Sequence, residues 1–267
     1  MIVISIVMPV YNKEKYVHSI LKDLQKQTFP NFECIVVDDG STDHSGIICD
    51  AVQKEDSRFQ VIHIENRGVS YARNMGLKMI RGNYLTFIDA DDRIGPDYLK
   101  VLYKDITESK ADMVIPGVEK WWENHQSTEL IKIPYQGKYQ MNELLPDFAM
   151  VQKSIGIYGY CCGKLFQRKL IEGVKFTEGL KLAEDFDFYL QIYPRVDTVF
   201  FVVFHAKRQE IKHKVEQMHQ IIYQEDISCQ GNGIFQKVIL WCIKKKKGKL
   251  AEVLLRYYDA ARCLRRN

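Results

Sequence analysis

The first half of the chain alternates between two hydrophobic periods, and this alternation limits the folds open to it. Apolar, strand-like runs are each followed by a segment with helical spacing, and the connections are short. We expect strands at Ile2–Val10, Phe32–Val37, Phe59–Ile64, Tyr84–Ile88 and Met113–Val118, and helices at Glu14–Gln27, Asp43–Gln53, Val69–Ile80 and Pro96–Thr107. Repeated units of this kind predict an α/β fold with a doubly wound, mainly parallel sheet, because right-handed crossovers place helices on both faces.

Size and composition fit a protein with a normal core. The chain has 267 residues, 46% of them hydrophobic, which allows one large α/β domain or two small ones. The apolar start has no basic leader or small-residue cleavage site, so we interpret Ile2–Val10 as a strand and not as a signal peptide. The longest apolar candidate, Val199–Phe204, is only strand length, which argues against a membrane-spanning helix. Seven scattered cysteines without a Cys-x-x-Cys pair favour a reducing cytosol over disulfides or a zinc site.

Charge is unevenly distributed along the chain. Residues 237–267 hold ten Lys or Arg against Glu252 and Asp259, a local charge of +8 that leaves −4 for the rest of a chain with net charge +4. Apolar residues recur at helical spacing from Leu250 to Leu264, with Trp241 nearby. A basic amphipathic helix of this kind can lie on an anionic membrane, or it can dock on the body or on another subunit. Nucleic acid is not an expected partner, because the lysines lack interleaved aromatic residues.

The strand Tyr84–Ile88 ends abruptly in a cluster of carboxylates, Asp89, Asp91 and Asp92. Its near-uniform apolar character suits a strand covered on both faces, and open α/β sheets bind ligands at the carboxyl ends of such strands. In an extended backbone Asp89 and Asp91 would leave on the same side, where they could hold Mg²⁺ or Mn²⁺ against phosphates. The alternative is an acidic loop that caps the following helix.

Polar residues also follow the other expected strands, at Pro9–Asn12, Asp38–Ser41 and Asn66–Gly68. None of these loops is a Gly-x-Gly-x-x-Gly or Gly-x-x-x-x-Gly-Lys-Ser/Thr motif, so the fingerprints of dinucleotide and P-loop folds are missing. If a nucleotide binds, carboxylates and a metal must replace the glycine cradle. The segment from Asp38 to Asp43 also fits a simple turn, with Thr42 or Asp43 capping the next helix.

Taken together, these motifs give the chain a family resemblance. It resembles the inverting family 2 glycosyltransferases with the GT-A fold, which build bacterial capsular, exopolysaccharide and cell-surface glycans. The resemblance covers roughly residues 3–203. It is carried by Val7–Asn12, Gln27–Phe29, Val36–Asp43, Asn66–Gly76, Asp89–Asp92, Gly163–Phe166, Phe176–Gly179 and Glu184–Asp185.

The resemblance implies transfer of a sugar from a nucleoside diphosphate, usually a uridine one, to an acceptor hydroxyl, with help from Mn²⁺ or Mg²⁺. It implies that Asp91 contacts the metal with Asp89 beside it and Asp92 in support, and His205 is a further candidate ligand. The residues expected at the nucleotide sugar are Pro9, Val10, Tyr11, Asp39, Arg73, Asp89, Ala90, Asp91 and Glu184. Among these, Asp39 would bond the base and the Tyr11 ring would cover it. Arg73 has an alternative as a helix-surface arginine.

The resemblance makes Asp185 the catalytic base. Glu184 and Asp185 open an apparent helix, where the helix dipole favours an ionised carboxylate. One positioned carboxylate suffices to take the proton of the attacking hydroxyl, and one base with a metal-held leaving group gives inversion. The alternative is that Asp185 and Asp187 cap this helix.

The chain departs from the family after the expected strand Asp197–Val203. It reads Phe204 to Ile211 without the family's serine, so His205, Lys207 or Arg208 would have to serve the metal or diphosphate, or else a surface helix starts here. This departure keeps a second function open. In it the chain is a catalytically weak GT-A subunit that acts through its tail as a partner or scaffold.

The segment from residue 119 to residue 182 is rich in aromatic residues, which suit an acceptor groove or core packing. They are Trp121, Trp122, Tyr135, Tyr139, Tyr158 and Tyr160. We expect Cys161 and Cys162 to pack without redox chemistry.

We expect a GT-A domain at residues 1–205, with a nucleotide-binding half (1–118) and an acceptor and catalytic half (119–205), and a basic, mostly helical extension at 206–267. The expected acceptor is a glycan, lipid-linked glycan or glycoprotein. We expect a cytoplasmic protein, and two roles remain open for residues 237–267: peripheral binding to the inner face of the plasma membrane, or contact between copies of the chain.

Overall fold

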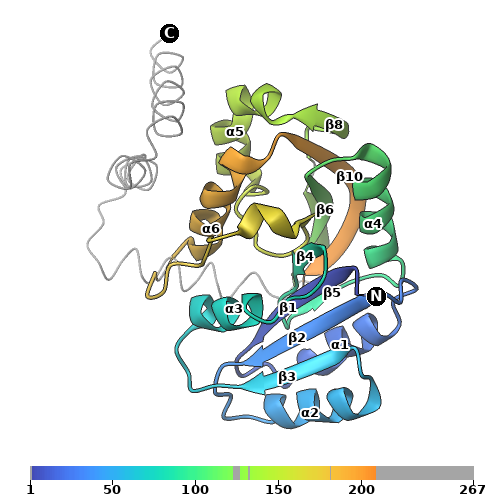
Figure 1. Cartoon of the computed structure of the whole chain (residues 1–267), viewed down its shortest axis with the longest axis vertical. Helices are drawn as coiled ribbons and strands as arrows, with labels where there is room; N and C mark the ends of the chain where they lie inside the picture. Colours follow the sequence, from blue (N-terminus) through green and yellow to red (C-terminus); the bar gives the residue numbers. More distant parts are fainter. Residues whose placement is uncertain (1, 123–126, 132, 181, 209–267) are drawn as a thin grey trace.

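The computed structural model describes residues 2–122, 127–131, 133–180 and 182–208 (Figure 1). The basic tail and the expected membrane or oligomer contact of residues 237–267 lie outside these residues. The expected division at residue 205 therefore stays a prediction. Within the described ranges, no helix combines the length and the apolar character needed to cross a membrane.

The first half of the described chain is a parallel sheet. Its neighbouring strands are β3 (Phe59–His63), β2 (Phe32–Asp38), β1 (Ile4–Val10) and β4 (Tyr84–Phe87). All three pairings among them are parallel, with β1 and β2 in register from Ile4 opposite Phe32 to Val10 opposite Asp38. The helices between them are α1 (Val17–Gln25), α2 (Ser45–Glu55) and α3 (Val69–Leu77). The predicted repeat of strands and helices is confirmed.

The second half continues the same sheet with mixed directions (Figure 1). The short β9 (Leu165–Gln167) runs antiparallel between β4 and β6 (Met113–Trp122), and β10 (Thr198–Arg208) lies parallel to β6. Three more strands pair at its margins, β5 (Asp92–Arg93), β7 (Ser127–Ile131) and β8 (Gly137–Gln140). The helical elements are α4 (Tyr98–Ser109), α5 (Met141–Ile155), α6 (Glu184–Ile192) and the 3₁₀ turns η2 (Arg168–Ile171) and η3 (Tyr193–Arg195).

Helices cover both faces of the sheet because the central strands are apolar on both sides. On β1, Ile4, Ile6 and Met8 pack with α1, α2 and α4, whereas Val7 packs in the cluster that holds α5 and α6. On β4, Leu85 and Phe87 belong to that second cluster. Full burial of each such aliphatic or aromatic side chain contributes roughly 1.5–3 kcal/mol. The interpretation of Tyr84–Ile88 as a strand covered on both faces is confirmed.

Helix α3 lies unusually close to β1. A Cβ on Gly76 would come within 2.5 Å of Val7 Cγ1, so only glycine allows this approach. The close packing fixes the height of α3 above the sheet, and with it the position of Arg73 one turn earlier in the helix.

The segment after Val203 differs from the prediction of a loop or a surface helix. Strand β10 continues to Arg208, with Lys207 paired to Arg93 and Arg208 paired to Asp92 of β5. The backbone hydrogen bonds of β5 and β6 therefore hold this stretch in extended form, and the surface-helix alternative is wrong. His205 lies on this strand, but its side chain is outside what the structure describes, so its role as a metal ligand stays a prediction.

Candidate functional site

The carboxyl ends of β1, β2 and β4 meet at one edge of the sheet. Asp39 donates its backbone N–H to the carbonyl of Val10 at 2.8 Å, and Ile88 donates to the carbonyl of Val7 at 3.3 Å. The loops that follow these strands therefore lie side by side, as ligand-binding loops do in open α/β sheets.

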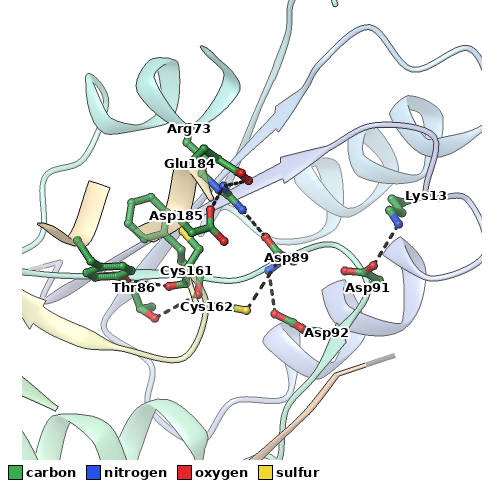
Figure 2. Close-up of polar contacts among 12 residues, drawn as sticks. Lys13, Arg73, Thr86, Asp89, Asp91, Asp92, Cys161, Cys162, Glu184 and Asp185 are labelled. Atoms are coloured by element: carbon green, nitrogen blue, oxygen red, sulfur yellow. Dashed lines mark hydrogen bonds and ion pairs between the residues drawn. The ribbon is translucent and has the colours of Figure 1, made fainter. Parts of the chain in front are cut away.

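The acidic cluster after β4 is a tight turn and not an extended strand. The N–H of Asp92 donates to the carbonyl of Asp89 at 3.0 Å, and the N–H of Asp89 donates to Asp92 Oδ2 at 3.0 Å. As a result Asp89 and Asp91 reach different partners, Arg73 and Lys13 (Figure 2). The expectation that these two side chains leave on the same side is wrong, because the chain reverses between them.

Arg73 joins this turn to the first turn of α6. Its side chain is fully buried, which overturns the helix-surface alternative. One guanidinium nitrogen lies 3.0 Å from Asp89 Oδ1, and the other pairs with Asp185 Oδ1 and lies 3.4 Å from Glu184 Oε1 (Figure 2). Burial alone would lower the pKa of Arg73, but the carboxylates, led by Asp185, raise it well above its usual range. A permanent positive charge thus sits among three acids.

The N-cap position of α6 is not held by a carboxylate. The helix starts at Glu184, and the N-cap residue before it, Ala183, makes no side-chain capping bond. Asp187 accepts a hydrogen bond from Thr177 Oγ1 at 2.7 Å, whereas Asp185 contacts Arg73. Neither Asp185 nor Asp187 is therefore the N-cap residue of α6.

Asp91 forms its ion pair with a residue that the sequence did not single out. Lys13 Nζ lies 3.1 Å from Asp91 Oδ2, and the side chain of Asp91 is only 9% exposed. Lys13 belongs to the loop between β1 and α1, and its backbone N–H donates to Ser45 Oγ at 2.7 Å. A lysine in a loop has no sequence signal that distinguishes it from a solvated one.

The turn could hold a divalent cation. Asp89, Asp91 and Asp92 are each less than 10% exposed. Asp89 pairs with Arg73, as do Glu184 and Asp185, whereas Asp91 pairs with Lys13. Buried carboxylate oxygens are the donors that Mg²⁺ and Mn²⁺ prefer. The donor set therefore fits the expected cation.

Cys162 belongs to the same group. One ligand atom each from Asp89, Asp92 and Cys162 lies within 4.8 Å of the others, and Cys162 Sγ is 3.7 Å from Asp89 Oδ2. Sequence reasoning placed Cys162 in packing, and nothing in the pattern of the chain could have placed it at the turn. Cys161 is buried as expected, and burial raises the pKa of its thiol.

Asp39 secures the neighbouring loop. Its two carboxylate oxygens accept the backbone N–H groups of Arg67 and Gly68, each at 2.9 Å. Gly40 has φ +70°, and a Cβ there would come within 2.8 Å of the backbone nitrogen of Asn66. The loops after β2 and β3 are thus fastened to each other beside the end of β1.

The expected base-binding residues of β1 lie at this same edge. Pro9 is half-buried, Val10 is buried and the Tyr11 side chain is 47% exposed, so its ring is available to a ligand. Ala90 is buried within the acidic turn.

The turn alternative for residues 38–43 also has support. Asp43 Oδ1 accepts the N–H of Ser45, the first residue of α2, at 2.9 Å, and Ser41 donates its N–H to Asp38 Oδ1 at 3.1 Å. These bonds shape the turn and the helix start, while Asp39 remains beside the end of β1.

Of the aromatic residues named for an acceptor groove or for core packing, the four whose side chains are described all pack in or against the core, as the packing alternative expected. Tyr158 is fully buried and stacks on Phe148 with ring centroids 4.2 Å apart. Tyr135 and Tyr139 pack on Phe201. Tyr160 lines a small pocket that also includes Asp92 and Cys162, and is the one described aromatic of this set beside the acidic turn. The side chains of Trp121 and Trp122 are not among those described.

Similar proteins bear on the family and the fold. Residues 5–172, more than half of the chain, match the model of glycosyl transferase family 2. The chain is 36% identical over 190 residues to glycosyltransferase GlyA of Streptococcus pneumoniae, a match that covers 68% of this chain and 27% of GlyA. It therefore spans about a quarter of the length of that relative.

Two solved structures share the fold. TarS residues 1–349 of S. aureus in complex with UDP-GlcNAc has a TM-score of 0.64 at 24% identity, covering 80% of this chain and 61% of that one. The mannosyltransferase PcManGT of Pyrobaculum calidifontis, in complex with GDP-Man and Mn²⁺, has a TM-score of 0.61 at 17% identity, covering 88% of this chain and 64% of that one. The predicted GT-A architecture is confirmed, and the chain belongs to glycosyl transferase family 2.

Proposed function

We propose that this chain transfers a sugar from a nucleoside diphosphate, with UDP as the preferred carrier, to an acceptor hydroxyl with inversion at the anomeric carbon. One observation carries the proposal. Arg73 contacts both Asp89, in the turn after β4, and Asp185, at the start of α6, so the acids expected at the donor and the acid expected at the acceptor share one guanidinium.

The donor side of the proposal uses the edge formed by β1, β2 and β4. Asp39 and the exposed ring of Tyr11 would take the base, with Pro9 and Val10 forming the wall behind it. Asp91 and Asp89 would hold a divalent cation, with Asp92 in support. Support comes from the complexes of TarS with UDP-GlcNAc and of PcManGT with GDP-Man and Mn²⁺. When bound, the cation would offset the negative charge that builds on the departing diphosphate.

The acceptor side of the proposal centres on Asp185. Its carboxylate would take the proton of the acceptor hydroxyl while that oxygen bonds to the anomeric carbon and the bond to the diphosphate oxygen breaks. Arg73 would keep Asp185 and Glu184 facing the donor turn. A single displacement from the face opposite the leaving group inverts the anomeric configuration.

The biological setting follows from the family resemblance. We propose that the acceptor is a glycan, lipid-linked glycan or glycoprotein of the bacterial surface, and that transfer takes place on the cytoplasmic side of the plasma membrane. The basic residues 237–267 would suit a peripheral position on the inner face, next to a lipid-linked acceptor.

The test combines binding and turnover by the full chain. At about 100-fold excess over its Kd, UDP should raise the melting temperature by about 5 °C or more in Mn²⁺ but not in EDTA. A screen of nucleotide sugars should find hydrolysis that is lost in EDTA, and Asp91→Ala should lose both effects. If the chain neither binds UDP nor hydrolyses any nucleotide sugar in Mn²⁺, the proposal is contradicted. Binding of UDP without turnover of any sugar would instead favour the catalytically weak subunit.

A further inference from the structure

We propose that Lys13 is a built-in counter-ion with which a divalent cation must compete for Asp91, and that it thereby sets the affinity of the site for the free cation. The inference rests on the cation site of the proposed function. It concerns a residue that neither the acidic motif nor the family match assigns to that site.

The position of Lys13 is fixed by its backbone. Its N–H donates to Ser45 Oγ at 2.7 Å, and its carbonyl accepts the N–H groups of Tyr16 and Val17, each at 2.9 Å. Ser45 is itself fully buried at the start of α2. Three hydrogen bonds to the starts of α1 and α2 therefore anchor this loop residue, and its side chain reaches Asp91 of the acidic turn from a defined point (Figure 2).

The ion pair is more than a surface contact. Lys13 Nζ lies 3.1 Å from Asp91 Oδ2, with the lysine side chain 29% exposed and the carboxylate 9% exposed. Removal of the partner of a buried carboxylate leaves an uncompensated negative charge, which is unfavourable unless another cation binds there. Arg73 cannot act as the counter-ion of Asp91, because its two terminal nitrogens already pair with Asp89, Glu184 and Asp185.

A cation that binds Asp91 must compete with the ammonium group. The cation either takes the place of Lys13 or shares the carboxylate with the nearby ammonium group. Both make the free energy of cation binding less favourable. With Lys13 in place, binding of the free cation at Asp91 is therefore weaker than the carboxylates of the acidic turn alone would give. A cation that binds together with a diphosphate brings negative charge with it. The Lys13 side chain can then form an ion pair with the diphosphate.

The experiment measures Mn²⁺ binding to the full chain without nucleotide, by electron paramagnetic resonance of the free ion. We expect Lys13→Met to bind Mn²⁺ about three- to tenfold more tightly than wild type, the size expected when a partly exposed ion pair no longer opposes binding. Lys15→Met is the matched control, since it removes the same charge from an exposed position of the same loop and should leave the affinity unchanged. Lys13→Arg keeps the charge and should stay near wild type.

A double-mutant cycle ties the effect to the ion pair. In an Asp91→Asn background, Lys13→Met should bring no gain in Mn²⁺ affinity, because the two residues act on each other. Equal gains from Lys13→Met and Lys15→Met would overturn the inference, since general electrostatics would then explain them.

The other outcomes separate this inference from the proposed function. Binding of Mn²⁺ by wild type with unchanged affinity in Lys13→Met overturns the inference alone. Weaker binding of UDP in Mn²⁺ by Lys13→Met, without any change in Mn²⁺ affinity, would make Lys13 a phosphate contact and also overturn it. Absence of Mn²⁺ binding in both proteins overturns the proposed cation site and the inference with it.

Discussion

The two halves of the sheet differ in how their sequence relates to their structure. In the first half, β1, β2 and β4 are parallel and buried, and their polar ends are read directly from the chain. In the second half, short antiparallel strands such as β9 and β5 depend on partners far away in the sequence. The first half supplies loops with local signatures, whereas the second supplies α6 and Asp185, whose role depends on where the fold places them. Arg73 is a fully buried residue that ties an acid of the first half, Asp89, to two acids of the second, Glu184 and Asp185.

The largest expected effect comes from removing that link. Arg73→Met should lower the free energy of unfolding by about 3–5 kcal/mol, because it leaves Asp89, Glu184 and Asp185 buried without their shared guanidinium. Urea unfolding measures this loss.

Arg67→Met is the matched control for Arg73→Met. Arg67 lies just before the same helix, is 53% exposed and reaches Glu178 at only 3.5 Å, so its loss should cost less than about 1 kcal/mol. Similar losses from the two variants would contradict a special role for Arg73 in joining the two halves.

The smallest expected effect lies within the first half. His63 contacts Asp38 at 2.8 Å and Asp50 at 3.0 Å, and hydrogen bonds to these carboxylates, Asp38 first, raise its pKa above 6.5. A raised pKa in the folded state stabilises the fold fully below the unfolded pKa, and this contribution is lost as the pH rises through the folded pKa. His63 is 48% exposed, so we expect only about 0.5 kcal/mol after screening by solvent.

The check for His63 is urea unfolding of wild type and His63→Gln at pH 6 and pH 9. The stability advantage of wild type should shrink toward pH 9. An advantage that grows with pH would mean that the neutral ring, and not the imidazolium, links β3 to the end of β2.

The sequence predicted the parts of the fold that local pattern determines. The strands of the first half were located to within about two residues, because their apolar runs end in polar loops. The direction of Asp91 was not predictable, since alternation along a strand fails once the chain turns at Asp89. The extension of β10 through Arg208 was also missed, because its charged residues resemble a surface segment until β5 is seen beside it.

The sequence named several residues of the candidate site, but it did not predict the contacts between them. Asp185 and Arg73 were both named from motifs, but 112 residues separate them, and no local pattern indicates that they form an ion pair. Lys13 and Cys162 escaped prediction for the same reason, since their partners Asp91 and Asp89 lie 78 and 73 residues away. Burial of Arg73 became evident only once α3, β4 and α6 were assembled.

The most direct test of the link between the two halves is turnover of a nucleotide sugar by Asp185→Asn, measured beside UDP binding in Mn²⁺. We expect turnover to fall by about 10²- to 10⁴-fold while the melting-temperature shift with UDP is retained, because the base acts on the acceptor and not on the donor. Asp187→Asn, which removes a charge from the same helix turn and can still accept the bond from Thr177, should keep most of the activity. Full turnover by Asp185→Asn would contradict the account.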